Sequence, residues 1–512
     1  MSRIQKSIAN ARVNMIFYVL SILLAFFSRK YFLQNLGTEF LGLSGTLGDM
    51  LNLMNITELG IGTAVGVTLY KPLFGNDRET INDIVSVFGF LYTRVGALIA
   101  FAGIVLSCFF PIIFKDAGLP LYLPYFMFYS MLYASLLGYF VNYKQIILSA
   151  SQQNYVITIR YQITVIIKTL LQIAVSFLPY NYIWWIALEA LTITIYSLIL
   201  NKSVYRYFPW LETSVARGKT KFKEYIHLWT KTKQVFVFKI SHIVYTSLIN
   251  ILISSFSGLT VVALFGNYNM LMSKITNMFD GLFTGMTASV GNLIAEGKID
   301  KIKKIFNELL SIRYFVAGLC SIVLYFTSTP FISIWLGDEY MLPKLIIALL
   351  SIHFFISQAR LTVTNFKDAY GFFQDIGAPI IEIVVYVALG IILGCFLGLT
   401  GILIGLIVSE LLVRMIWQPY YLFKHGFKQS VLKMYWPIVL KYLCIIVIST
   451  VATSLISQMY LSYNAIDGWL SMVVYCLIIG VVVFLILTIL FFIADKFFRA
   501  FFNHIYSYLK NR

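Results

Sequence analysis

The chain has few charged residues, and few of these are acidic. Asp, Glu, Lys and Arg make up 12% of its 512 residues, with 22 Asp and Glu against 39 Lys and Arg. A typical soluble domain carries about 25% charged residues. Because 59% of the residues are hydrophobic and the mean hydropathy is +0.82, the composition excludes a soluble globular protein and predicts an integral membrane protein.

Cysteine and long polar loops are also scarce, which limits the kinds of site and activity that the chain can have. All five cysteines fall in apolar stretches (Cys108, Cys320, Cys395, Cys444 and Cys476), so neither a disulfide framework nor a metal site is expected. No gap between apolar stretches exceeds about 30 residues, which leaves no room for a soluble catalytic domain. No phosphate-cradling glycine loop followed by Lys and Ser is present, so we expect neither ATP hydrolysis nor a cofactor. The chain is therefore predicted not to be an enzyme.

Long apolar stretches fill most of the sequence. A helix that crosses a hydrocarbon core of about 30 Å needs roughly 20 apolar residues, and fourteen stretches meet this requirement. They cover residues 13–35, 40–70, 84–114, 119–143, 153–178, 182–201, 234–257, 259–294, 309–329, 341–366, 376–396, 398–422, 434–460 and 468–494. The sequence predicts an all-α, multi-pass membrane protein with about 14 transmembrane helices.

Lys and Arg are sorted between the gaps. Of the 39, 30 lie in or close to every second gap and only four lie in the intervening gaps. Cytoplasmic loops carry the excess of Lys and Arg, so both termini are predicted to be cytoplasmic. The formal net charge of +17 is then explained by the orientation of the chain in the membrane and by attraction to anionic lipid head groups. We therefore expect no binding to nucleic acid.

The two halves of the chain follow one plan. Residues 36–111 align with residues 257–330, with Gly37 matching Gly258 and a glycine-rich span following each. An even number of spans separates the copies, so the sequence predicts two six-helix lobes related by a pseudo-twofold axis along the membrane normal, plus two extra C-terminal helices. The predicted division is an N-lobe over 1–208, a basic cytoplasmic linker over 209–233, a C-lobe over 234–425, and the last two spans with a tail over 426–512.

The basic linker has its own pattern. Phe222, Tyr225, Ile226 and Trp229 follow one another at helical spacing. This pattern predicts an amphipathic helix lying on the membrane surface.

One stretch resembles a known family. Ser28 to Leu73, SRKYFLQNLGTEFLGLSGTLGDMLNLMNITELGIGTAVGVTLYKPL, is similar to the opening of bacterial polysaccharide-type flippases of the multidrug, oligosaccharidyl-lipid and polysaccharide (MOP) exporter superfamily. The span count and the repeat extend this resemblance over the whole chain. It implies a fold similar to that of the lipid II flippases and the multidrug and toxin extrusion antiporters.

The resemblance also implies a function. That function is export of an undecaprenyl-pyrophosphate-linked oligosaccharide across the bacterial inner membrane by alternating access, for O-antigen, capsule or exopolysaccharide biosynthesis. Polysaccharide polymerase machinery would be a partner. Arg29 stands eight residues before Gly37, close to where the lipid II flippases carry an essential arginine, and Lys30 is a substitute for it.

Several cations do not fit the sorting because they lie inside predicted spans. Lys274 is the deepest, about 22 Å from the outer end of its helix at a rise of 1.5 Å per residue, and it shares a polar stripe with Asn267. Lys239 aligns with Asn250, and Lys168 lies beside Gln172. A pyrophosphate in hydrocarbon requires several cations. The candidate phosphate-binding residues are Arg29, Lys30, Lys168, Lys239 and Lys274. The alternative is that each pairs with an internal carboxylate and holds spans together.

Acids and amides inside the spans are candidates for ion coupling. A carboxylate removed from water can bind H⁺ or Na⁺ and release it in another state. Asp49 leads because it shares a stripe with Asn52. The other candidates are Glu58 and Asp280, with Glu189, Glu382 and Glu410 behind them, and Glu410 has an i,i+4 partner in Arg414. The polar residues predicted to line the cavity are Asn52, Asn250, Asn267 and Asn277.

Two other classes of function remain as alternatives. A cation-coupled multidrug antiporter would have the same fold, but cationic cargo favours an acidic or neutral cavity. A membrane-embedded polysaccharide polymerase or ligase would need paired catalytic residues near one face and a sizeable external loop, and the sequence has neither.

Overall fold

The computed structural model describes the backbone of residues 3–55, 61–115, 117–151, 153–295, 298–372, 375 and 377–510. Within these ranges it describes all side chains except those of residues 3–12, 14–15, 61, 63–64, 67, 226–243, 245–246, 279–289, 291–293, 295 and 504–510. Helices connected by turns and short loops account for the described ranges, which contain no strand. The predicted all-α fold class is confirmed.

The chain divides into two compact units, Met1–Ala263 and Leu264–Arg512, and the division falls inside one helix, α10 (Ile226–Ala295). Unit 1 contains α1 (Arg3–Met54), α2 (Ile61–Gly75), α3 (Arg78–Ser107), α4 (Phe110–Ile113), α5 (Tyr122–Phe140), α6 (Ile146–Ala150), α7 (Asn154–Ser176), α8 (Asn181–Tyr207), α9 (Val215–Lys221) and the first part of α10.

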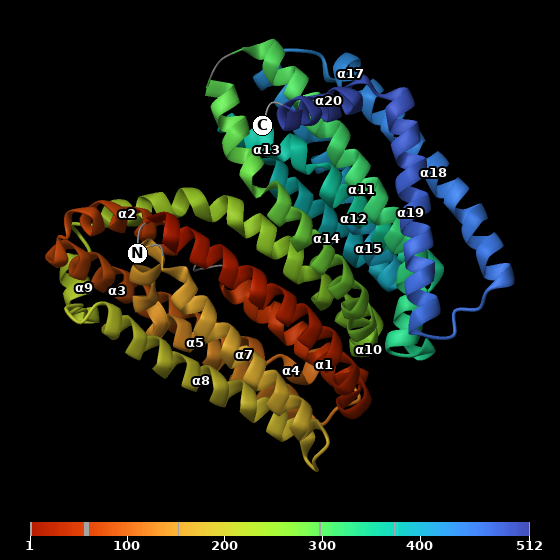
Figure 1. The fold of residues 1–512 in the computed structure, drawn as a ribbon. Helices are drawn as coiled ribbons and strands as arrows, with labels where there is room; N and C mark the ends of the chain where they lie inside the picture. The colour runs from red at the N-terminus through yellow and green to blue at the C-terminus, as the bar shows by residue number, and fades with distance from the viewer. Residues whose placement is uncertain are drawn as a thin grey trace. The chain divides into compact units, whose positions relative to one another are not determined.

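Unit 2 contains the remainder of α10 and the later helices, and Figure 1 shows the helices of each unit. These are α11 (Ile299–Trp335), α12 (Lys344–Ala359), α13 (Leu361–Ala369), α14 (Gly377–Leu397), α15 (Leu399–Glu410), α16 (Gln418–Leu422), α17 (Val431–Met434), α18 (Trp436–Tyr463), α19 (Trp469–Ala494) and α20 (Lys496–Lys510), with π-helical segments at Leu411–Trp417 and Phe423–Phe427.

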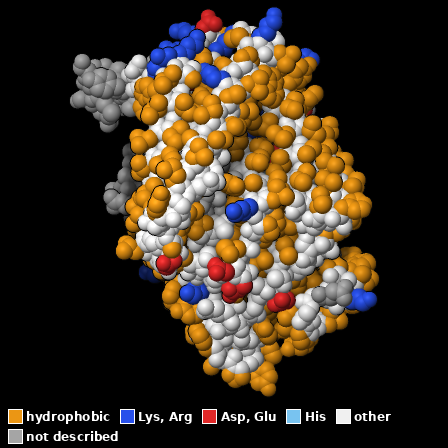
Figure 2. Space-filling view, turned by 90° about the vertical axis from the view of Figure 1, so that its right-hand side faces the viewer, with side chains coloured by type: hydrophobic (Ala, Val, Ile, Leu, Met, Phe, Trp, Pro, Cys, Tyr) orange, Lys and Arg blue, Asp and Glu red, His pale blue; other side chains and the backbone are white. Residues whose placement is uncertain are grey.

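Eleven helices in the described part of the chain are long and apolar enough to cross a membrane. Two of them, Ile16–Met54 and Ser247–Met278, run through a glycine with non-helical backbone angles, so each holds parts of two predicted spans. The tyrosine-rich α5 is a further predicted span. With these taken into account, a helix lies at each of the fourteen predicted stretches. Hydrophobic side chains cover most of the face drawn in Figure 2, and Lys and Arg gather at its upper edge.

The two interrupting glycines are the pair that the sequence repeat aligns. Gly37 has φ 81° and ψ 168°, and Gly258 has φ 85° and ψ 169°. Residues with a Cβ rarely adopt this conformation, whereas glycine does so at little cost. The same break therefore occurs at matching positions of the two copies, between the first and second predicted span of each.

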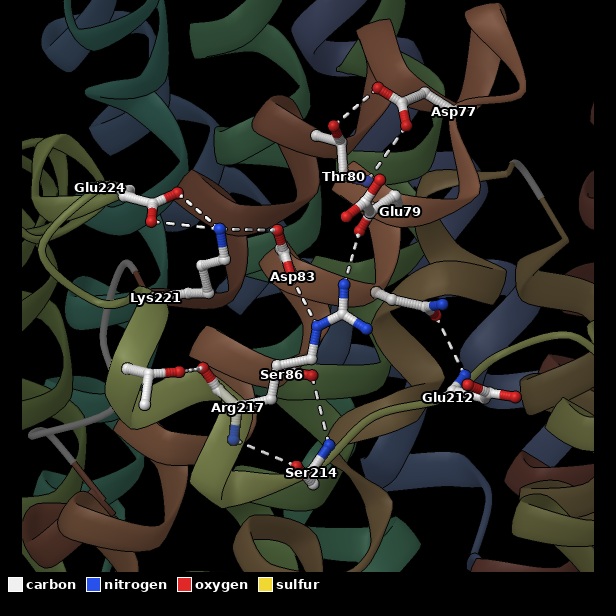
Figure 3. A network of polar contacts seen from close by, with 12 residues as sticks. Asp77, Glu79, Thr80, Asp83, Ser86, Glu212, Ser214, Arg217, Lys221 and Glu224 are labelled. Carbon is white, nitrogen blue, oxygen red and sulfur yellow. Dashed lines mark hydrogen bonds and ion pairs between the residues drawn. The ribbon is translucent and has the colours of Figure 1, made fainter.

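The segment after α8 packs against unit 1 through a polar network that Figure 3 shows. Arg217 on α9 places Nε 2.5 Å from Oδ1 of Asp83 on α3, and Nζ of Lys221 lies 3.8 Å from the other oxygen of Asp83. A Cβ on Gly218 would lie 2.0 Å from the carbonyl oxygen of Ser86. Hydrogen bonds to the carboxylate of Glu224 raise the pKa of Lys221. Ion pairs and close backbone approach thus hold α9 on the end of α3.

This docking changes the interpretation of the linker. The predicted surface helix through Phe222 and Tyr225 is wrong, because residues 222–225 form a turn between α9 and α10. The ring of Phe222 lies 5.7 Å from the ring of Phe90 on α3, so this part of the apolar face packs on protein. The side chains of Ile226 and Trp229 lie outside the described residues.

In unit 2 a buried carboxylate joins the last three helices to α11. Asp495 follows α19 directly and accepts hydrogen bonds from Lys441 Nζ (2.7 Å), Ser311 Oγ (2.6 Å), Tyr442 Oη (2.8 Å) and the backbone N–H of Phe498 (3.0 Å). Burial alone would raise the pKa of Asp495, but its side-chain donors outweigh burial and hold that pKa below its ordinary value. The carboxylate also caps the N-terminus of α20, which fixes the start of that helix against α11.

Candidate functional site

The first part of α10 packs against α1 inside unit 1, and Gly42 permits the contact. A Cβ at Gly42 would lie 1.9 Å from the carbonyl oxygen of Leu259 and 2.9 Å from its Cα, so only glycine fits there. A row of polar groups accompanies this contact. We call it the α1–α10 seam, and it consists of Arg29, Glu39, Asp49 and Asn52 on α1 with Asn250, Thr260 and Ala263 on α10.

Arg29 is the cation of the seam. Its side chain is half-buried, and Nη2 donates a hydrogen bond to the carbonyl oxygen of Ala263 at 2.9 Å. The neighbouring Lys30 is exposed. Arginine is rare inside spans unless it faces polar groups, and its planar guanidinium binds phosphate oxygens two at a time. The seam therefore holds a permanent cation at the position that the sequence singled out.

Three predicted residues come together around Asp49. Its carboxylate accepts hydrogen bonds from the side-chain amides of Asn52 and Asn250. The contact with Asn52 lies within one helix turn, whereas Asn250 is supplied by α10. A half-buried carboxylate held by two amides is a site where a proton or small cation can be gained and lost.

Glu39 was missed by the sequence interpretation. One carboxylate oxygen accepts a hydrogen bond from Thr260 Oγ1 at 3.0 Å, and the other accepts one from Thr38 Oγ1 at 3.2 Å. The signal that could have found it is an acid two residues after Gly37, in the short gap between the first two predicted spans. Glu39 adds a second carboxylate to the seam.

Lys168 lies in a different place, between α7 and α8. Its Nζ is 2.7 Å from Oε1 of Glu189, and Nε2 of Gln172 donates to the other Glu189 oxygen at 3.2 Å. The side chains of Lys168 and Glu189 are 21% and 24% exposed. The contact is the pairing with an internal carboxylate that the sequence left open as the alternative role for Lys168.

Unit 2 carries the polar stripe of the second part of α10. Asn267 is fully buried, Lys274 is half-buried and Asn277 is exposed. The remaining candidates, Glu58 and the side chains of Lys239 and Asp280, lie outside the described residues.

Unit 2 also contains a buried charge cluster, which consists of His353, Glu382, Glu410 and Arg414. Nη1 of Arg414 lies 2.8 Å from Oε1 of Glu410, and its Nε pairs with Glu382. Nδ1 of His353 lies 2.8 Å from the other oxygen of Glu410. The predicted i,i+4 pair is confirmed, while the partners on α12 and α14 were not foreseen. Arg414 lies in a π-helical segment, a feature frequent at functional sites, and its pairs join α14 to α15.

The chemistry available at these sites is binding of anions and small cations. The residues described by the structure contain no group of three or more His, Cys, Asp or Glu side chains arranged to hold a metal ion. What the seam offers is one permanent cation, two carboxylates and two amides along a contact between helices. Such groups suit a transported ligand and a coupling ion.

Comparison with known proteins supports a transporter fold. No family model matches the chain, and no curated protein matches its sequence. Among solved structures, the MurJ lipid II flippase in an inward closed conformation matches with a TM-score of 0.61 and 17% identity, over 96% of this chain and 99% of that one. An inward-facing multidrug resistance MATE family transporter of the MOP superfamily matches with a TM-score of 0.55 and 14% identity, over 81% and 99%. MATE in the bent conformation matches with a TM-score of 0.52 and 13% identity, over 80% and 93%.

These likenesses show the fold. The multi-pass helical chain shares the fold of solved flippase and multidrug transporter structures over most of its length. More particularly, the fold is the one that the solved MurJ flippase and MATE transporter structures share, and this is the fold that the resemblance at residues 28–73 implied.

Proposed function

We propose that the chain is a flippase that moves an undecaprenyl-pyrophosphate-linked oligosaccharide across the bacterial inner membrane for assembly of O-antigen, capsule or exopolysaccharide. The observation that carries the proposal is that each unit has a basic side chain half-buried on an apolar helix, Arg29 in unit 1 and Lys274 in unit 2. A pyrophosphate carries at least two negative charges, and cations attract it most strongly where water screens them least. The fold shared with a lipid II flippase over 96% of the chain supports a lipid-linked cargo.

Arg29 and Lys274 take the phosphate-binding role ahead of the other candidates. Lys168 lies between α7 and α8, where it forms an ion pair with Glu189 that joins the two helices, and Lys30 is exposed whereas Arg29 is half-buried. Lys239 remains a candidate phosphate-binding residue because of its position in the sequence.

Asp49 is the proposed coupling residue. The amide N–H groups of Asn52 and Asn250 hold its half-buried carboxylate in place, and a carboxylate inside a span can bind and release H⁺ or Na⁺. Alternating access would then change the surroundings of Asp49 and release the ion on one side.

The test is leaflet-resolved transport in proteoliposomes loaded with a polyprenyl-pyrophosphate-linked oligosaccharide. A glycosidase outside the vesicle measures how much cargo reaches the outer leaflet. We expect Arg29→Ala and Lys274→Ala to abolish movement of cargo, and Lys344→Ala, an exposed cation at the start of α12, to leave it unchanged. Full transport by a properly inserted Lys274→Ala protein would refute the proposal. Transport insensitive to both H⁺ and Na⁺ gradients would refute the role of Asp49.

A cation-coupled multidrug antiporter is the second candidate, because two MATE transporters match with TM-scores of 0.55 and 0.52. The basic side chains Arg29 and Lys274 disfavour cationic drugs. Deletion of the gene separates the two functions. Accumulation of a lipid-linked oligosaccharide on the cytoplasmic leaflet supports the flippase, and increased drug sensitivity without such accumulation supports the antiporter.

A further inference from the structure

A basic hollow of about 870 Å³ lies in unit 2 where the chain passes from the π-helical segment Leu411–Trp417 to α18. Lys424 and Lys428 both line it, and the described lining residues include no acid. Two cations without a neutralising carboxylate in the lining favour an anionic ligand. The hollow lies at the membrane face that the Lys and Arg distribution predicts to be cytoplasmic.

The groups around this hollow are held in place. Nζ of Lys424 donates to Tyr420 Oη at 3.1 Å. The indole N–H of Trp417 donates to the Asp375 carboxylate at 3.0 Å, which fixes the ring that forms one wall. Lys428 has φ 52°, a left-handed backbone conformation that is strained for a residue with a Cβ. Glycine is the usual residue at such a helix end, so a lysine there supplies a charge at a cost in backbone energy.

A second, apolar hollow of about 720 Å³ adjoins the first, because Ile416 and Trp436 line both. Its walls come from α11, α12 and α18, and along α18 it continues as far as Ser454. At 1.5 Å per residue this length is about 27 Å, against a hydrocarbon core about 30 Å thick. A basic hollow at the interface thus adjoins an apolar groove long enough for a hydrocarbon chain.

We propose that the two adjoining hollows bind one anionic glycerophospholipid of the cytoplasmic leaflet. Its phosphate lies between Lys424 and Lys428, and its acyl chain fills the groove. The side chain of Gln429 also lines the first hollow and offers a polar group to the lipid headgroup. Basic pockets between spans on this side of a membrane are typical sites for anionic lipids. A polyprenyl pyrophosphate shares this chemistry, so the experiment must separate the two. The proposal does not depend on the proposed transport function.

The experiment uses the full chain in nanodiscs of phosphatidylcholine with one fifth phosphatidylglycerol, and native mass spectrometry counts the lipids that stay bound. We expect one phosphatidylglycerol to be retained. The double variant Lys424→Gln/Lys428→Gln should bind it about 25-fold more weakly, because each lysine near an anionic surface contributes about fivefold. Lys433→Gln removes an exposed lysine outside the hollow and should leave retention unchanged.

The groove is tested separately. Val451→Trp places a large ring in the groove, whereas Ile448→Trp places the same ring on an exposed face of α18 outside it. Only the first should weaken lipid retention. Equal retention by the double lysine variant, an equal loss with Lys433→Gln, or lysine-dependent binding of polyprenyl pyrophosphate but not of phosphatidylglycerol would each overturn the proposal.

Discussion

Substitution of Gly42 should disrupt the whole α1–α10 seam. An added Cβ would lie 1.9 Å from the carbonyl oxygen of Leu259, whereas ordinary contact begins at 3.4 Å, so α10 must retreat by about 1.5 Å. That shift would lengthen the 2.9 Å bond between Arg29 and the carbonyl of Ala263 beyond hydrogen-bond distance. The contacts of Asp49 with Asn250 and of Glu39 with Thr260 would weaken too.

The expected loss follows from these contacts. Polar contacts between membrane helices contribute about 0.6 kcal/mol each, up to about 1.7, and overpacking costs about 1–3 kcal/mol, so Gly42→Ala should lower the free energy of unfolding by about 3–5 kcal/mol. SDS titration in mixed micelles, followed by tryptophan fluorescence, measures this change. Gly48→Ala is the matched control, since no atom lies within 4 Å of its added Cβ. If the two variants unfold within about 1 kcal/mol of each other, glycine at position 42 does not set the helix separation.

Three further outcomes are expected. Lys168→Met should lower the unfolding free energy by about 1–2 kcal/mol, because it leaves the Glu189 carboxylate without its cation. Adding Glu189→Gln should restore most of the lost free energy. Additive losses in SDS titration would contradict the pairing. The ionised Asp495 carboxylate should stabilise the fold fully above pH 3.8, its ordinary pKa, and this stabilisation should be lost as pH falls through its lower folded-state pKa. Asp495→Asn should remove this pH dependence from melting temperatures recorded against pH. The same fall in melting temperature at acid pH in the variant would refute the role of Asp495. Gly218→Ala should release α9 and speed trypsin cleavage there, whereas Gly75→Ala, with open space around its Cβ, should not; equal cleavage would show that α9 is not held by close backbone approach.

The sequence could predict features that depend on a single helix or on the surrounding lipid. Helix-length apolar stretches predict spans because hydrocarbon cannot hydrogen-bond an open backbone. The match between Gly37 and Gly258 predicted a shared plan, and both residues have the same unusual backbone conformation. Asp49 and Asn52 were placed together because they lie three residues apart on one helix.

Contacts between side chains on two different helices were harder to predict from the sequence. Asn250 and Asp49 were named separately, and only the packing of α10 on α1 brings them into contact. Lys168 and Glu189 were both candidates, yet helical projection cannot give the rotation of α8 against α7 that pairs them. The prediction of a surface helix through Phe222 and Tyr225 failed because periodicity cannot reveal that the chain turns there and that Asp83 on a distant helix holds α9.

The position of α10 in the chain has a consequence for dissecting the molecule. Its first part packs against α1 in unit 1, and beyond the break at Gly258 the helix continues into unit 2. Cutting the chain in the segment between α8 and α9 would leave the C-terminal fragment with a projecting helical arm whose binding surface is on the other fragment. Co-expressed fragments would therefore reassemble by arm insertion, and a chain cut there would behave as an interlocked pair rather than as two separable lobes.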